Sequence, residues 1–266
     1  MRGYGMLVLA PLVLASCSGG GSPDEAGRSA PTDPPASRGA RASPASGHQD
    51  TGVGDKDAAR LPTSREDALA FIGRVIAGPG NFGPGVVKRS PYQSDPATWP
   101  VLGTDCAWRQ EKPARGVLAT RTRFFEVPAA GGRGPLRLSA VVTVHRTRED
   151  ARWDMAESVE EAMRCPTQRW ERGEVIGSLI PGFLERGERR QDDSEDSLTG
   201  TGRYRSPELG GGPYPYSWQQ AQTRRFTVAV TGKGAEGWTE EEIHALTVRA
   251  QAAMLVRIGS ALRAAP

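Results

Sequence analysis

Alternating apolar and polar side chains predict antiparallel strands in the middle of the chain. From Leu136 to Val144 every second residue is apolar, and most of the intervening residues are polar. A period of two places alternate side chains on opposite faces of a strand, so one face of this segment is expected to be buried. Another strand is expected over 117–127, and the Gly- and Pro-rich residues 128–135 join the two as a hairpin. A further long strand region is expected over 217–231.

Three segments place apolar residues at helical spacing behind a sequence that favours a helix start. Residues 63–66, Thr-Ser-Arg-Glu, fit a capping box, in which the Thr hydroxyl and the Glu carboxylate each accept from a free backbone N–H. The second helix is expected from Thr147 to about Cys165, with acidic residues in its first turn, where they favour the helix dipole. The third follows a capping box at 239–242 and extends to about Leu262.

Between these elements the sequence predicts loops and short strands. Gly and Pro are frequent after the first helix as far as Pro100, which predicts a long ordered loop. One or two short strands are expected in 174–190, and two more loops at 191–197 and 209–215. The antiparallel strands and the amphipathic helices together predict a single α+β domain over residues 62–266, in which an antiparallel sheet is covered by helices.

The first residues have the pattern of an export signal. An apolar run over 6–14 is shorter than the roughly 20 apolar residues that span a membrane, which predicts a signal peptide over residues 1–16. Residues 14–17, Leu-Ala-Ser-Cys, resemble a bacterial lipobox, whose cysteine receives lipid, palmitate included. We therefore expect a lipoprotein anchored through Cys17 to the outer face of the cell membrane. The alternative is a free Cys17 thiol beside an ordinary cleavage site.

Residues 17–61 are rich in Gly, Ser, Pro and Ala and contain almost no large apolar side chain. Such a segment cannot bury enough apolar surface to offset the entropy lost on ordering, so it is expected to be a disordered tether. A flexible chain of this length has a root-mean-square span of roughly 35–40 Å. A binding tail is the alternative interpretation.

The charge balance argues against nucleic acid as a partner. Lys and Arg number 34 and Asp and Glu number 31, and the basic residues are interleaved with the acidic ones. A nucleic-acid-binding domain carries a concentrated basic patch instead. The expected partners are the membrane, reached through the lipid anchor, and a small-molecule, glycan or envelope-protein ligand.

Two cysteines besides Cys17 are present, Cys106 and Cys165. An isolated pair in an exported protein is expected to form a structural disulfide, which would connect the chain before the hairpin to the end of the following helix. A redox-active pair is the competing interpretation, but redox motifs usually separate their cysteines by two residues.

The order of these elements, together with Asp105-Cys106-Ala107-Trp108 and the run Ala-Met-Arg-Cys-Pro at 162–166, resembles the PknH-like extracellular sensor domain, an actinobacterial family. In that family the domain lies outside a membrane-bound Ser/Thr kinase, and lipoproteins carry relatives of it. The resemblance covers about residues 63–264. It implies a cleft-bearing module that senses or binds a ligand and does not catalyse a reaction. It transfers no ligand-binding residue to this chain.

The sequence contains no recognisable motif for catalysis or metal binding. The three histidines, His48, His145 and His244, do not form a metal-binding pattern, and no nucleophile motif accompanies them. The acidic residues near 192–196 lack the Gly and the distal Glu of a calcium loop. We therefore expect no catalysis, no metal and no cofactor. Six tryptophans either line a glycan or lipid pocket or fill the core: Trp99, Trp108, Trp153, Trp170, Trp218 and Trp238.

Three functions remain open, and each has a structural marker. A membrane-anchored binding or sensing domain would contain a cleft. An envelope assembly or protein-interaction factor would expose a large apolar patch. An enzyme, the least expected of the three, would bring titratable groups with perturbed pKa values together in one pocket.

Overall fold

The structure is a computed structural model, and it describes residues 60–183 and 194–263. These residues belong to one compact unit. The predicted signal peptide, the lipidation site at Cys17 and nearly all of the predicted tether lie outside the described residues. No helix in the described ranges is both long enough and apolar enough to cross a membrane.

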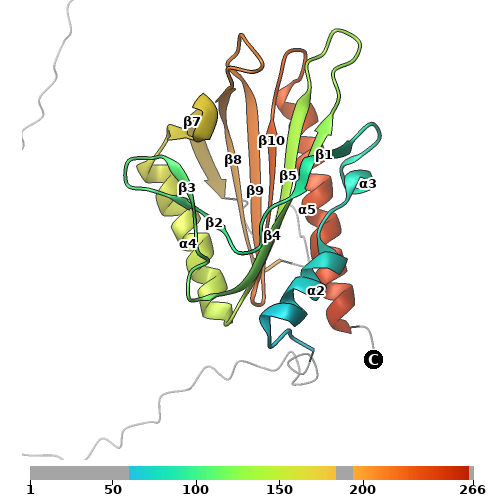
Figure 1. The fold of residues 1–266 in the computed structure, drawn as a ribbon, viewed down its shortest axis with the longest axis vertical. Helices are drawn as coiled ribbons and strands as arrows, with labels where there is room; N and C mark the ends of the chain where they lie inside the picture. The colour runs from blue at the N-terminus through green and yellow to red at the C-terminus, as the bar shows by residue number, and fades with distance from the viewer. Residues whose placement is uncertain (1–59, 184–193, 264–266) are drawn as a thin grey trace, which may run out of the picture. The chain divides into compact units, whose positions relative to one another are not determined.

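The centre of the fold is an antiparallel sheet (Figure 1). Because each strand pairs antiparallel with its neighbours, the predicted α+β class with an antiparallel sheet is confirmed. In spatial order the described strands are β1 (Val87–Gln93), β4 (Val117–Val127), β5 (Leu136–His145), β10 (Phe226–Lys233), β9 (Tyr214–Thr223), β8 (Asp196–Arg205), β7 (Val175–Phe183) and β6 (Gln168–Arg169).

Helices α2 (Arg65–Val75), α3 (Pro79–Phe82) and α5 (Glu240–Arg263) pack on one face of the sheet. Alternate side chains of β5 and β10 point to this face, as the period of two predicts, and they form the main hydrophobic core with the apolar faces of the helices. The largest contributors from the two strands and from α5 are Leu136, Leu138, Val142, Phe226, Val228, Ile243, Met254 and Ile258.

The opposite face carries α4 (Arg148–Arg164) and a separate hairpin of β2 (Trp99–Leu102) and β3 (Trp108–Glu111) (Figure 1). A short 3-10 helix, η1 (Glu171–Gly173), connects β6 and β7. The side chains of β5, β9 and β10 that alternate with the core residues point to this face. Many of them are polar or aromatic, as Thr227, Gln220 and Trp218 illustrate. The two faces of the sheet therefore differ in chemistry: the face toward α5 carries the larger apolar core, and the face toward α4 carries a smaller cluster around Ala162, Ile176 and Tyr204.

The disulfide predicted between Cys106 and Cys165 is present. Cys106 lies in the turn between β2 and β3, and Cys165 is the C-cap of α4. Their Cα atoms are 5.5 Å apart, within the range that a disulfide requires. The bond joins the β2–β3 hairpin to the C-terminal end of α4.

The segment as far as Pro100, expected to be a loop, instead contains α3, β1 and the start of β2. This expectation was wrong because β1 has no alternation to detect: it is an edge strand, it contains Pro91, and most of its residues are exposed or half-buried. An edge strand buries little apolar surface on either face, so its sequence carries little signal.

The region 217–231, expected to be one strand region, is two strands connected by a tight turn. Arg224 has φ 53° at this turn, a conformation for which the sequence offers no Gly or Asn. Strand β8 was also missed, since a loop was expected to extend to residue 197. On its face toward α4 the residues are, in order, Leu198, Gly200, Gly202 and Tyr204, so two of the four positions have no side chain to produce an apolar pattern.

The helix boundaries follow the predicted capping signals closely. Thr147 caps α4 in a capping box with Asp150, and Thr239 accepts from the backbone N–H of Glu242 at the start of α5. At the first helix the cap is Ser64, which accepts from the Asp67 N–H, and not the preceding Thr expected from the sequence. Both residues can cap a helix, and the chain uses the position one residue later.

Candidate functional site

A cleft of about 400 Å³ opens between α4, the β2–β3 hairpin and the polar face of the sheet. Its volume lies within the range of sites that hold small molecules, on the order of 300–1,000 Å³. The described residues that line it are Trp99, Pro100, Val101, Trp108, Glu111, Lys112, Ala114, Val141, Asp154, Glu157, Ser158, Glu161, Ala162, Gln168, Leu179, Tyr216, Trp218, Gln220, Thr227 and Ala229.

Three indole rings from three different strands form aromatic walls of this cleft: Trp99 of β2, Trp108 of β3 and Trp218 of β9. Each of them is only partly buried. Trp218 lies close over Gly200 of the neighbouring strand, where a Cβ atom would come within 2.8 Å of the indole ring. The glycine therefore makes room for the ring.

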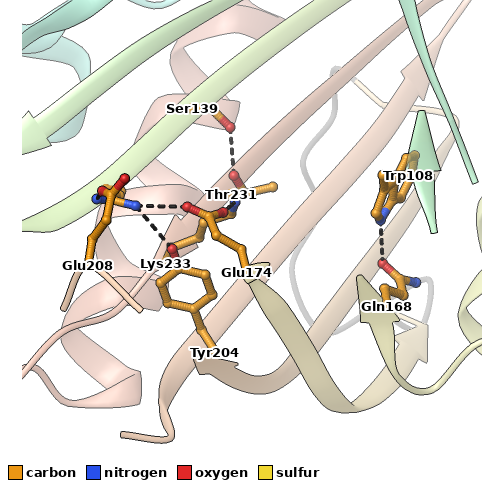
Figure 2. A network of polar contacts seen from close by, with 9 residues as sticks. Trp108, Ser139, Gln168, Glu174, Tyr204, Glu208, Thr231 and Lys233 are labelled. Carbon is orange, nitrogen blue, oxygen red and sulfur yellow. Dashed lines mark hydrogen bonds and ion pairs between the residues drawn. The ribbon is translucent and has the colours of Figure 1, made fainter. Parts of the chain in front are cut away.

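The Trp108 ring is fixed at its edge and on one face. Its Nε1 donates a hydrogen bond of 3.0 Å to Oε1 of Gln168 (Figure 2). Trp170, which does not line the cleft, stacks on Trp108 with ring centroids 4.9 Å apart and an interplanar angle of 18°. Offset stacking of this kind is a favourable arrangement for aromatic rings. Trp108 is thus held in place by Gln168 and Trp170.

Acidic side chains of α4 form the wall opposite. Asp154, Glu157 and Glu161 follow one another at spacings of three and four residues, which places them on one side of the helix. Asp154 is held by the sheet: its Oδ2 accepts from Nε2 of Gln220 at 3.2 Å and lies 3.6 Å from Nε2 of His145.

Glu157 and Glu161 differ from Asp154, because their carboxylates make no hydrogen bond or ion pair with another described residue. Burial raises the pKa of Glu161 to about 7, and the neighbouring charge of Glu157 adds to the effect, while Arg164 partly opposes it. The pKa of Glu157 is also raised, first by burial and then by Asp154 and Glu160. Glu161 is therefore a partly buried carboxylate at the cleft and Glu157 an exposed one, and neither forms an ion pair with another described residue.

No model of a known protein family matches this sequence, and the comparison with curated proteins finds no match either. Among solved structures the chain is similar to the crystal structure of the extracellular domain of PknH from Mycobacterium tuberculosis. The two share 12% sequence identity, the match covers 76% of this chain and 94% of that chain, and the TM-score is 0.42. The fold class given above rests on the strand pairing and helix packing of this chain.

The histidines considered in the sequence do not come together. His145 is buried on β5, and its Nε2 lies 2.9 Å from Oγ1 of Thr227, the same nitrogen that approaches Asp154. A catalytic triad instead places its hydroxyl and its carboxylate on opposite ring nitrogens. His244 contacts Gln219 on the other face of the sheet, and His48 lies outside the described residues. Within the described residues no cluster of three His, Cys, Asp or Glu side chains could hold a metal ion.

A second polar feature lies on the same face of the sheet, at the other end of β5 and β10. Glu174 accepts from Nη1 of Arg137 at 2.8 Å and from Nζ of Lys233 at 2.6 Å (Figure 2). Arg137 also pairs with Glu208 and donates to the Tyr204 hydroxyl at 3.2 Å. Lys233, Arg137 and Glu174 are each less than one-fifth exposed, so this is a largely buried ionic network.

The charges in this network stabilise one another. Although burial by itself raises the pKa of Glu174, its contacts with Lys233, Tyr204 and Arg137 lower that pKa overall. Burial lowers the pKa of Lys233, and Glu174 opposes that shift. Lys233 also lies over the ring of Trp170, 4.8 Å from its centroid. The network therefore supports Trp170, the ring on which Trp108 rests.

The structure divides the six tryptophans into three groups. Trp99, Trp108 and Trp218 line the cleft, Trp170 and Trp238 pack against other side chains, and Trp153 is 64% exposed on α4. The acidic wall was missed at the level of sequence. A signal was available in the spacing of Asp154, Glu157 and Glu161, which places three acidic residues along one side of the helix beside its apolar stripe.

Proposed function

We propose that this chain is an extracytoplasmic binding protein, anchored through lipid on Cys17 to the outer face of the cell membrane. Its folded domain binds or senses a small ligand in the cleft between α4 and the β2–β3 hairpin, and it does not catalyse a reaction. The tether between anchor and domain keeps the cleft away from the membrane surface.

The observation that carries this proposal is the combination of free volume and exposed recognition groups in one place. The cleft has room for a small molecule, partly exposed indole rings on its walls, and carboxylates with no partner among the described residues. Binding sites in proteins are typically concave, largely apolar and supplied with a few polar groups.

An assembly or protein-interaction factor has less support. Its marker would be a contiguous exposed apolar patch. The strongly exposed large apolar side chains of the described residues are distributed over separate elements: Val87 on β1, Trp153 and Met163 on α4, Ile180 on β7 and Val256 on α5.

One observation favours catalysis as a second candidate. A carboxyl group with a pKa of about 7, such as Glu161, is suited to donate a proton near neutral pH. General acid catalysis of glycoside cleavage uses a second carboxyl group across the scissile bond. We favour binding, since Glu157 and Glu161 both lie on α4, the carboxyl group of Asp154 is already engaged by the sheet, and the sequence carries no catalytic motif. Glu111 of β3 is the one carboxyl group that lines the cleft from the hairpin among the described residues. If the protein converts a bound compound into a product that it releases, the chain is an enzyme.

The anchor is tested by Cys17→Ser in the producing cell. The variant is expected to leave the membrane fraction or to remain unprocessed, because the acyl chains provide the membrane affinity. A correctly cleaved Cys17→Ser protein that stays in the membrane would contradict the anchor.

The binding site is tested on the full mature chain with a library of small metabolites, sugars and amines, measured by thermal shift. A ligand of the cleft is expected to raise Tm for the wild type and for Trp153→Ala, whose side chain lies outside the cleft, but not for Trp218→Ala. If no compound raises Tm, or if Trp218→Ala responds like Trp153→Ala, the cleft is not the binding site.

A further inference from the structure

We propose that the cleft takes a small organic cation, one that carries an amine or a quaternary ammonium group, held between the indole rings and the α4 carboxylates. This inference rests on the proposed function, because it assigns a ligand class to the same cleft.

The aromatic walls provide the first half of the argument. Trp99, Trp108 and Trp218 come from three strands and leave ring surface open to the same space. The face of an indole ring attracts cations through its quadrupole, and groups of such rings recognise quaternary ammonium ligands. Trp108 is held by Gln168 and Trp170, so this ring is in place before a ligand arrives.

The charges of the lining residues provide the second half. Glu111, Asp154, Glu157 and Glu161 line the cleft, whereas Lys112 is the one lysine or arginine among the described lining residues. Glu161 is partly buried and Glu157 is exposed. A partly buried carboxylate without an ion-pair partner is unfavourable unless a positive charge approaches it. A cation in the cleft would therefore improve the environment of Glu161 above all. An anion would be repelled by these carboxylates, and a neutral molecule would leave the charge of Glu161 uncompensated.

The same residues distinguish an organic cation from a metal ion. The described residues contain no group of three His, Cys, Asp or Glu side chains placed to coordinate a metal. A cleft of about 400 Å³ with aromatic walls suits a larger cation with apolar groups around its charge. Burial and the neighbouring charge of Glu157 raise the pKa of Glu161 despite the opposing charge of Arg164, which agrees with a place where an added cation is favourable.

The test compares pairs of probes that share a shape and differ in charge. Choline is paired with 3,3-dimethylbutan-1-ol, and putrescine at neutral pH is paired with butane-1,4-diol. Binding to the full mature chain is measured by titration calorimetry and by quenching of tryptophan fluorescence. The cation of at least one pair is expected to bind at least about tenfold more tightly than its neutral partner, as loss of a contact to a charged group predicts.

Two variants on the same helix locate the effect. Glu161→Gln is expected to remove most of the preference for the cation. Glu160→Gln is the matched control, because Glu160 is 60% exposed, pairs with Arg164 and does not line the cleft. This control is expected to keep the preference. The fold of each variant is checked by its circular dichroism spectrum.

The outcomes separate the ligand class from the site. If a cation binds and the preference is lost in Glu161→Gln but kept in Glu160→Gln, the inference is supported. It is overturned if neutral partners bind equally well, if Glu161→Gln binds cations like the wild type, or if only neutral library compounds bind in the cleft. In that last case the proposed function still stands. If no compound of either kind binds, the proposed function fails as well.

Discussion

Cys106 and Cys165 join two walls of the cleft, since one lies in the turn of the β2–β3 hairpin and the other ends α4. The hairpin is not part of the main sheet. The disulfide therefore adds a covalent link to the contacts with Gln168 and Trp170 that hold Trp108, and with it the hairpin, opposite the acidic side of α4.

Removing this bond in Cys106→Ala/Cys165→Ala is expected to preserve the circular dichroism spectrum and to lower the free energy of unfolding. The bond spans 59 residues of sequence, and chain entropy predicts a loss of about 4 kcal/mol. Urea denaturation measures the loss. Reductant should destabilise the wild type to a similar extent and leave the double variant unchanged. Two free thiols from these positions in denatured, unreduced protein would contradict the disulfide.

Glu174 is expected to be essential to the buried ionic network. Glu174→Gln removes the negative charge shared by Lys233 and Arg137, and breaking a buried ion pair on one side costs about 3 kcal/mol. Glu208→Gln is the control: Glu208 also pairs with Arg137 but is 54% exposed, so its loss should cost under about 1 kcal/mol. If Glu174→Gln and Glu208→Gln lower the free energy of unfolding equally in chemical denaturation, burial does not determine the strength of these ion pairs.

Glu161 is expected to make the fold less stable as the pH rises. Its pKa is about 7 in the folded state against an ordinary value of 4.5, so the folded state binds more protons between these two pH values. The free energy of unfolding therefore falls from about pH 4.5 to pH 7 and stays reduced above it. Below pH 4.5 both states are protonated, and the effect disappears.

Glu161→Gln removes this dependence. Thermal and urea denaturation at pH 8 should find the variant more stable than the wild type by on the order of 1 kcal/mol, after allowance for partial solvent contact, and no difference should remain at pH 4. Other charged groups near the cleft contribute their own pH dependence to both proteins, so the comparison uses the difference between the two. These groups are Glu111, Lys112, Asp154, Glu157, Glu160 and Arg164. A variant that is less stable than the wild type at pH 8 would contradict the assignment.

Gly232 of β10 allows α5 to pack closely on the sheet. A Cβ atom at this position would overlap the Cγ2 methyl group of Ile243 and lie 3.3 Å from Cγ2 of Thr247. Gly232→Ala is therefore expected to lower stability by about 2 kcal/mol, as for other overpacked cores. Gly73→Ala, in α2 with open space around it, is expected to raise stability by about 0.5–1 kcal/mol. Thermal denaturation of both variants checks the contrast.

The sequence predicted elements that bury one regular apolar face. Strand β5 matches its prediction within one residue because Leu136 through Val144 contact the α5 core at every second position. Helix α4 also matches, since Thr147 supplies both a cap and a start signal. Periodicity failed where burial is slight, as at β1, or where glycine replaces the inward side chain, as at Gly200 and Gly202.

Of the candidate site, the sequence predicted the disulfide and named the tryptophans as possible pocket residues, but it did not distinguish the three that line the cleft from the three that do not. Trp108 and Trp218 are separated by more than one hundred positions in sequence, and only the strand order brings them to one cleft. The role of Glu161 depends on how deeply α4 packs, which no local pattern reveals. A pKa that is raised by burial can be inferred only from the assembled fold, where the burial of the side chain is known.

The two edges of the main sheet have a consequence for how the protein behaves when many copies are crowded together. At one edge β6 is two residues long, and at the other β1 contains Pro91, which has no N–H to donate, and a shift of register against β4. Short or irregular edges offer a poor template for another chain to extend the sheet. Folded domains that are crowded together can therefore collide often without pairing sheet edge to sheet edge. We expect them to remain monomeric and not to aggregate through their sheets.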